Sequence, residues 1–143
     1  MKKVLVINGP NINLLGHREP QIYGSLSLSE IEKALRQEAE KLKIEIEFFQ
    51  SNSEGDIVSK IQSLFGAENT GLIINPAAYT HTSAAIRDAI AAVGVKTIEV
   101  HISNIYAREE FRHKSFIAPL CIGQISGLGA DGYIFALKKL AVL

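Results

Sequence analysis

The sequence predicts a doubly wound α/β domain, in which a five-stranded parallel sheet is covered by helices on both faces. Short β-branched runs alternate along the chain with segments whose apolar residues recur with the 3.6-residue period of a helix. No Pro/Ser-rich linker, internal repeat or low-complexity stretch interrupts this alternation. We therefore expect a single domain spanning residues 1–143.

The alternation divides the chain into five strand–helix units. The predicted strands are Val4–Ile7, Ile44–Phe49, Leu72–Ile74, Thr97–Ile102 and a weaker one near Cys121–Ile125. Helical spacing is found, in chain order, at Ile31, Leu35 and Leu42; at Ile57, Ile61, Leu64 and Phe65; at Ile86, Ala89, Ile90 and Val93; and at Tyr133, Ile134, Leu137 and Leu140. Five such units in a chain of this length are typical of the flavodoxin-like fold.

Helix ends carry their own signals. Ser27 and Glu30 have the spacing of a capping box before the first helix. Gly66 and Gly94 stand where the second and third helices should end in a left-handed residue.

The composition excludes several classes of protein. The 143 residues include 15 Lys plus Arg and 15 Asp plus Glu, so the formal net charge at pH 7 is zero. Proteins that bind nucleic acid or a membrane surface usually carry a basic excess. No apolar run is long enough for a membrane span or a signal peptide, and the single cysteine fits a reducing compartment. We expect a cytoplasmic protein that binds neither nucleic acid nor membrane.

Polar side chains follow three of the predicted strands. The first strand leads into residues 8–11, the third into Asn75 and residues 79–83, and the fourth ends in residues 99–104. Ligands of open parallel sheets bind beyond the carboxyl ends of the strands. In the fourth strand Glu99 and His101 share a face, where the carboxylate can orient the imidazole as a general acid. A structural polar pair at a sheet end is the alternative.

The segment from Gly9 to Ser25 has 17 residues and no strong periodicity. Loops of this length inside compact domains are usually functional or disordered. It contains Arg18 and Tyr23, and a guanidinium close to a phenol favours the ionised form that acts as a base. An exposed arginine and a packing tyrosine are the alternative.

Other motifs are weaker. Gly127, Gly129 and Gly132 spell G-x-G-x-x-G, but only 11 residues follow, which leaves no room for the rest of a dinucleotide-binding unit. We expect these glycines to let the last helix pack closely on the sheet. No metal-binding spacing of His, Cys or acidic residues appears, so no metal is expected. Cys121 is expected in the core rather than as a nucleophile.

Six motifs occur in order along the chain: NGPNINLLGHREPQIYG from Asn8, QSNSEG from Gln50, NPAAYTHTSAAIRDA from Asn75, EVHISN from Glu99, REEFRH from Arg108 and GQISGLGADGY from Gly123. In these motifs the sequence resembles the type II 3-dehydroquinate dehydratases over essentially its whole length. One departure is Ala77, where that family commonly has glycine.

The resemblance implies a catalytic domain that eliminates water from 3-dehydroquinate, without a cofactor, to give 3-dehydroshikimate in the shikimate route to chorismate and the aromatic amino acids. By analogy Tyr23, assisted by Arg18, removes a proton beside the ketone, and Asn11 stabilises the resulting enolate through an ordered water. His101, oriented by Glu99, protonates the departing hydroxyl. The matching substrate-binding positions are Asn75, His81, Ile102, Ser103, Arg108 and Arg112, with Asp88 reaching the site of a neighbouring subunit. The family match also implies trimers assembled into a homododecamer.

One other function stays open, and one other mechanism is disfavoured. A flavodoxin-like binding or signalling module would hold flavin or phosphate at the same sheet edge, but it would not explain Asn11, Arg18 and Tyr23 in the first loop. An enzyme that forms an imine would need a lysine, and no lysine lies in the strand-end segments.

Overall fold

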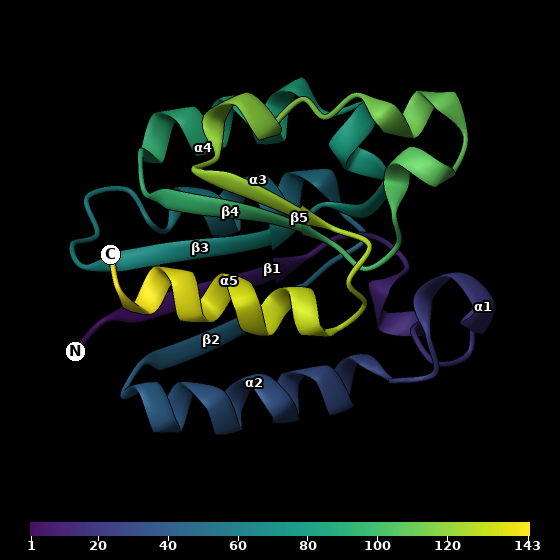
Figure 1. Cartoon of the computed structure of the whole chain (residues 1–143). Helices are drawn as coiled ribbons and strands as arrows, with labels where there is room; N and C mark the ends of the chain where they lie inside the picture. The colour runs from purple at the N-terminus through teal and green to yellow at the C-terminus, as the bar shows by residue number, and fades with distance from the viewer.

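All five strands run parallel in one sheet, in the order β2-β1-β3-β4-β5 (Figure 1). The computed structural model describes residues 1–143. The strands are β1 (Lys3–Asn8), β2 (Glu45–Gln50), β3 (Thr70–Asn75), β4 (Lys96–His101) and β5 (Gly123–Ser126). This order is the flavodoxin-like one. The strand β2 lies on one side of β1, whereas β3, β4 and β5 follow one another on its other side, so the strand order reverses between β1 and β3. The predicted fold class is confirmed.

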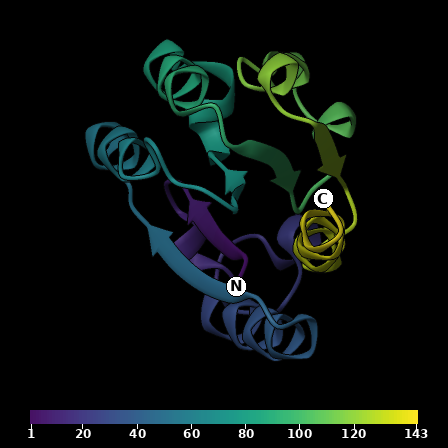
Figure 2. The same ribbon diagram turned by 90° about the vertical axis from the view of Figure 1, so that its left-hand side faces the viewer.

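Two helices cover each face of the sheet. The helices α2 (Leu28–Leu42) and α5 (Asp131–Ala141) lie on one face, and α3 (Glu54–Gln62) and α4 (Ala84–Val93) lie on the other (Figures 1 and 2). Because successive side chains of a strand point to opposite faces, Val4 and Val6 of β1 pack with α2 and α5. Leu5 and Ile7 pack with α3 and α4. Both faces of β1 are therefore buried, as its continuous apolar sequence indicates.

The predicted helix signals are confirmed at two ends. Ser27 accepts a hydrogen bond from the Glu30 amide and Glu30 reaches back to the Ser27 amide, which completes the capping box. Gly94 ends α4 with a φ of 66°. None of the helices is both long and apolar enough to cross a membrane.

The end of the second helix differs from the prediction. The helix α3 stops at Gln62, four residues before Gly66, and Ser63 is its C-cap. Gly66 does adopt a left-handed conformation, with a φ of 77°, but in the turn that follows. That turn buries Leu64 and leaves Phe65 76% exposed, so placing Phe65 on the buried helical face was wrong.

The connection from β4 to β5 contains no α-helix, so the expectation of five strand–helix units is wrong at the fourth unit. Three short 3₁₀ helices, η3 (Ile105–Ala107), η4 (Glu110–His113) and η5 (Ala118–Leu120), take its place. Residues 103–120 lack a helical apolar stripe and carry Pro119, which removes a backbone donor. The segment from Gly9 to Ser25 is likewise built from two short turns, η1 (Ile12–Leu14) and α1 (Pro20–Tyr23).

The glycines after β5 serve the turn and the packing of α5. Gly127 and Gly129 have φ values of 88° and 63°, which residues with a Cβ atom rarely adopt. A Cβ atom on Gly132 would lie 3.2 Å from Ile125 Cγ2 and 3.3 Å from Val100 Cγ1. The expected close approach of the last helix to the sheet is confirmed at Gly132.

Ala77 follows β3 and occupies the left-handed region, with a φ of 55°. For a residue with a Cβ atom this conformation costs about 1–2 kcal/mol relative to the right-handed one. Ala77 is the first residue of the 3₁₀ helix η2 (Ala77–His81), so the strain lies at the start of a segment that carries His81.

Substitutions at Ala77 test this strain. Ala77→Gly relieves the strain, but it removes a half-buried methyl group and raises the conformational entropy of the unfolded chain. Because these effects oppose one another, the free energy of unfolding should change by less than about 1 kcal/mol. Ala77→Val places a β-branched residue in the same conformation and should lower it by about 2 kcal/mol or more. Chemical denaturation measures both, with Ala78→Val as the matched exposed control. An Ala77→Val protein as stable as the Ala78→Val protein would contradict the assignment.

Candidate active site

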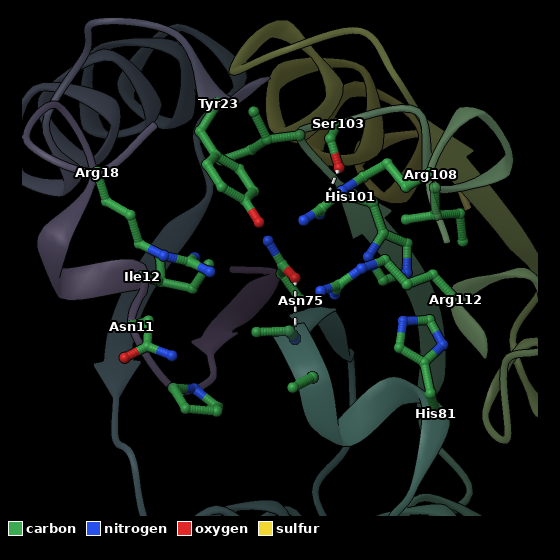
Figure 3. A pocket seen from close by; sticks show the side chains of 15 residues that line it. Asn11, Ile12, Arg18, Tyr23, Asn75, His81, His101, Ser103, Arg108 and Arg112 are labelled. Carbon is green, nitrogen blue, oxygen red and sulfur yellow. Dashed lines mark hydrogen bonds between the residues drawn. The ribbon is translucent and has the colours of Figure 1, made fainter. Parts of the chain in front are cut away.

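A pocket opens at the carboxyl edge of the sheet, beyond the ends of β1, β3 and β4 (Figure 3). Asn8 and Asn75 end these two strands and are paired in register. Ten of the twelve residues that the sequence places in the site line this pocket: Asn11, Arg18, Tyr23, Asn75, His81, His101, Ile102, Ser103, Arg108 and Arg112. The location therefore follows the rule for open parallel sheets.

Glu99 is the eleventh residue and lies behind His101 rather than in the pocket wall. Its carboxylate accepts a hydrogen bond from His101 Nε2, and the Glu99 side chain is fully buried. The arrangement leaves His101 Nδ1 without a protein partner. The predicted pairing of Glu99 with His101 on one face of β4 is present.

Two further donors hold the Glu99 carboxylate in place. Ser115 Oγ donates to it over 2.8 Å, and Gln124 Nε2 donates over 2.9 Å. Ser115 Oγ also accepts the amides of Ile117 and Ala118, so its proton is directed at Glu99. Gln124 lies directly across from Glu99 in β5. A buried carboxylate needs such partners, because leaving it unpaired would be costly.

Tyr23 extends from the short helix α1 into the pocket, where two guanidinium groups lie close to its ring (Figure 3). The Arg18 Cζ atom lies 4.9 Å from the centre of the Tyr23 ring. The Arg108 Cζ atom lies 5.2 Å from the same point. These two arginines come from distant segments of the chain, so the loop of residues 9–25 and the β4–β5 connection meet at Tyr23.

The pocket wall is rich in positive groups and contains no acidic side chain. Arg108 donates to Ser103 Oγ over 3.2 Å, and its side chain is 13% exposed. Arg112 is 17% exposed and forms an ion pair with Glu109, which lies outside the pocket. The zero net charge of the chain thus conceals a locally cationic site, which suits a small anion.

His81 lies beside His101 with the two rings stacked at 6.4 Å between centroids. The Lys114 carbonyl is 2.8 Å from His81 Nδ1 and can only accept, so Nδ1 carries the proton and Nε2 is an acceptor. Burial lowers the pKa of His81 below its ordinary value, and the nearby His101 and Arg112 lower it further. His81 is therefore neutral at neutral pH.

Asn11 has a left-handed backbone, with a φ of 71°. Its backbone N–H donates to Asn52 Oδ1 over 3.0 Å, and Gln50 Nε2 donates to the Gly9 carbonyl over 3.1 Å. Tyr79 in turn donates to the Asn52 carbonyl over 2.7 Å. The residues after β2 thus hold the first loop against the sheet.

Asp88 is the predicted site residue that the structure places elsewhere. It lies on α4 outside the pocket, its side chain is 75% exposed, and it pairs with the adjacent Arg87. Cys121 also lies outside the pocket, where burial and the charge of Glu99 raise its pKa to about 12. A protonated thiol is a poor nucleophile, and no cluster of three or more potential metal-ligating side chains is present.

Several supporting residues were missed by the sequence analysis. Ser115, Gln124, Asn52 and Tyr133 contact a predicted site residue but do not line the pocket. Gln124 could have been found from strand order, because it faces Glu99 once β5 is placed beside β4. Asn52 and Ser115 lie in irregular segments and Tyr133 lies on the last helix. Nothing in the sequence indicates which site residues these three contact.

The fold and the pocket define a flavodoxin-like α/β protein with acid–base and cationic side chains gathered at the carboxyl edge of its sheet. The sequence model of a family described as dehydroquinase class II matches residues 2–141. A 3-dehydroquinate dehydratase from Endomicrobium trichonymphae is 65% identical over 143 residues, which cover 100% of this chain and 99% of the relative. One from Caldicellulosiruptor bescii is 61% identical, over 98% of this chain and 97% of the relative.

Solved structures agree with the sequence relatives. A type II dehydroquinase from Butyrivibrio crossotus superposes with a TM-score of 0.94 at 51% identity, covering 97% of each chain. One from Propionibacterium acnes gives 0.95 at 43% identity, covering 100% of this chain and 98% of the other. The chain therefore belongs to the class II dehydroquinase family, the type II 3-dehydroquinate dehydratases, which are hydro-lyases.

The environment of His81 predicts its titration. In an NMR titration of the histidine ring protons, the His81 signal should have its midpoint below the ordinary value of about 6.5, because burial and the neighbouring positive groups disfavour the imidazolium. His81→Asn identifies the signal by removing it, and His17→Asn, which removes an exposed histidine, is the control. A midpoint above 6.5 would contradict the stacked, half-buried environment.

Proposed function

We propose that this chain dehydrates 3-dehydroquinate to 3-dehydroshikimate by a cofactor-free elimination that passes through an enolate. The observation that carries the proposal is the presence of Tyr23 and His101 in one pocket, each with the partner that its role requires. The substrate is a small polyhydroxylated carboxylate with a ketone, and its hydroxyl leaves from the position next to the carbon that loses a proton.

Tyr23 is the general base of this proposal. A phenol is a weak base until it is ionised, and positive charge close by stabilises the phenolate. The guanidinium carbons of Arg18 and Arg108 lie 4.9 and 5.2 Å from the centre of the Tyr23 ring and place positive charge beside it. Proton removal beside the ketone gives an enolate, which Asn11 stabilises through an ordered water.

His101 is the general acid. Its Nε2 is held by Glu99, which orients the ring and stabilises the imidazolium, so Nδ1 can deliver a proton to the departing hydroxyl. Placing the base on a loop and the acid on a strand lets the two groups approach the substrate from different walls of the pocket.

The remaining polar groups bind the substrate. Arg112 and the Arg108–Ser103 pair offer donors to its carboxylate and hydroxyls. His81 offers an acceptor at Nε2, which suits a substrate hydroxyl. Asn75 and the Ile102 amide complete this set, and Arg108 closes the pocket against Tyr23.

The wider setting of the reaction is part of the proposal. The family suggests the shikimate route as the pathway, the cytoplasm as the location, and a homododecamer of trimers in which Asp88 reaches a neighbouring site. The exposed position of Asp88 on α4 is compatible with such a contact.

An imine mechanism is less well supported. None of the fifteen residues that line the pocket is a lysine. A flavin- or phosphate-binding module is likewise less well supported, since the acid–base pair and the arginines at Tyr23 have no part in such binding.

The proposal is tested by adding 3-dehydroquinate to the purified protein and following the conjugated enone product in the ultraviolet. We expect absorbance to rise with time and in proportion to enzyme concentration. A correctly folded protein that gives no rise would overturn the proposed function, and a yellow preparation with bound flavin would favour the binding module.

Tyr23→Phe should lower kcat at least about a hundredfold, because it removes the base. The ring remains beside Arg18 and Arg108, so the fold and the affinity for the product, measured by calorimetry, should persist. Ile22→Val alters the same short helix outside the pocket and is the matched control. Near-normal turnover in the Tyr23→Phe protein would assign the base elsewhere.

Treatment with borohydride in the presence of substrate distinguishes the two routes of dehydration. An imine enzyme is inactivated because the imine is reduced to a stable amine. Since no lysine lines this pocket, activity after removal of the reagent should equal that of a sample treated without substrate. Substrate-dependent loss of activity, with a matching mass increase on a lysine, would contradict the enolate route.

A further inference from the structure

We infer that Tyr133, a residue of α5 outside the pocket, is a positioning residue that fixes Asn75 as a hydrogen-bond donor to an acceptor oxygen of the substrate. The inference rests on the proposed function for the presence of a substrate at Asn75. Tyr133 has no part in the chemistry described above, and its hydrogen bond to Asn75 sets the direction of the contact between Asn75 and the substrate.

A buried chain of hydrogen bonds connects Asn75 to the end of β1. Asn75 Nδ2 donates to Tyr133 Oη over 3.0 Å, and Tyr133 Oη donates to Asn8 Oδ1. Asn75 Oδ1 accepts the Ala77 amide over 3.1 Å. All three side chains of the chain are at most 3% exposed, so water does not compete for these groups.

The direction of every bond follows from the Ala77 amide. A backbone N–H can only donate, so the Asn75 atom that faces it must be the oxygen. The nitrogen of Asn75 therefore faces Tyr133, whose oxygen must accept. The single proton of Tyr133 is then left for Asn8, which must present its oxygen. No other assignment gives each close contact one donor and one acceptor.

Tyr133 is suited to this role because its proton count does not change. Burial raises its pKa well above the ordinary value for tyrosine, so the hydroxyl is neutral over the whole working range. Its ring is fully buried in the core between α5 and the sheet. The hydroxyl is thus held at a fixed place below the pocket.

One hydrogen of the Asn75 amide remains after these bonds are made. Asn75 lies at the base of the pocket, among Tyr23, Arg112 and His101 (Figure 3). With its oxygen turned towards the Ala77 amide and one hydrogen used by Tyr133, the remaining hydrogen is the group that Asn75 presents to a ligand. The substrate atom at this point must be an acceptor, such as a carboxylate oxygen or a hydroxyl lone pair.

A double-mutant cycle tests this assignment through 3-dehydroquinate turnover. Tyr133→Phe keeps the ring but leaves the Asn75 side chain held only by its bond from the Ala77 amide, so Asn75 is positioned less precisely and kcat/KM should fall about tenfold, mainly through KM. In an Asn75→Ala background the same change should cost less than about twofold, since the group it positions is gone. Leu137→Val, a conservative change on the same buried face of α5, is the control and should lower thermal stability without changing KM.

Equal losses in both backgrounds would show a general structural effect and would overturn the inference, as would an unchanged kcat/KM in the Tyr133→Phe protein. Inactive wild-type enzyme would instead overturn the proposed function. Neutron diffraction from deuterated wild-type crystals is a second test that does not require a folded variant. It should show the Tyr133 deuteron directed at Asn8, and a deuteron directed at Asn75 would contradict the assignment.

Discussion

The structure depends on one buried charge, the Glu99 carboxylate. An isolated carboxylate in a protein interior is costly, and the cost is offset only when its oxygens are paired. Here the partners come from three places: His101 from β4 itself, Gln124 from β5, and Ser115 from the connection between them. Ser115 thus ties the irregular residues 102–122 to the buried carboxylate, and the same segment carries Arg108 and Arg112 to the pocket.

The pocket divides its chemistry between rigid and irregular elements. The sheet supplies His101 and Asn75, whose positions are fixed by buried hydrogen bonds beneath the pocket. The connections between strands supply Tyr23, Arg18, Arg108 and Arg112. In the proposed mechanism the acid is anchored by the core and the base is carried on the first loop, so the leaving hydroxyl would meet a group of fixed position.

Much of this could be predicted from sequence, and the failures have physical reasons. The fold followed from apolar periodicity, and the site location followed from the rule for parallel sheets, since Asn8, Asn75 and His101 all end strands. Glu99 beside His101 followed from strand alternation. Ser115 and Tyr133 could not be predicted, because their contacts cross about 16 and 58 residues of chain through irregular segments. Phe65 was misplaced because periodicity does not show where a helix stops.

In the proposed mechanism Tyr23 removes the proton and His101 acts separately, by protonating the departing hydroxyl. The most direct test is to incubate the His101→Ala enzyme with 3-dehydroquinate in deuterated water and to follow the proton beside the ketone by NMR. We expect dehydration to fall steeply while exchange of this proton for deuterium continues, because the proposed base and enolate site are intact. Loss of exchange in the same proportion as dehydration, in a variant that still binds the product, would contradict the proposed mechanism.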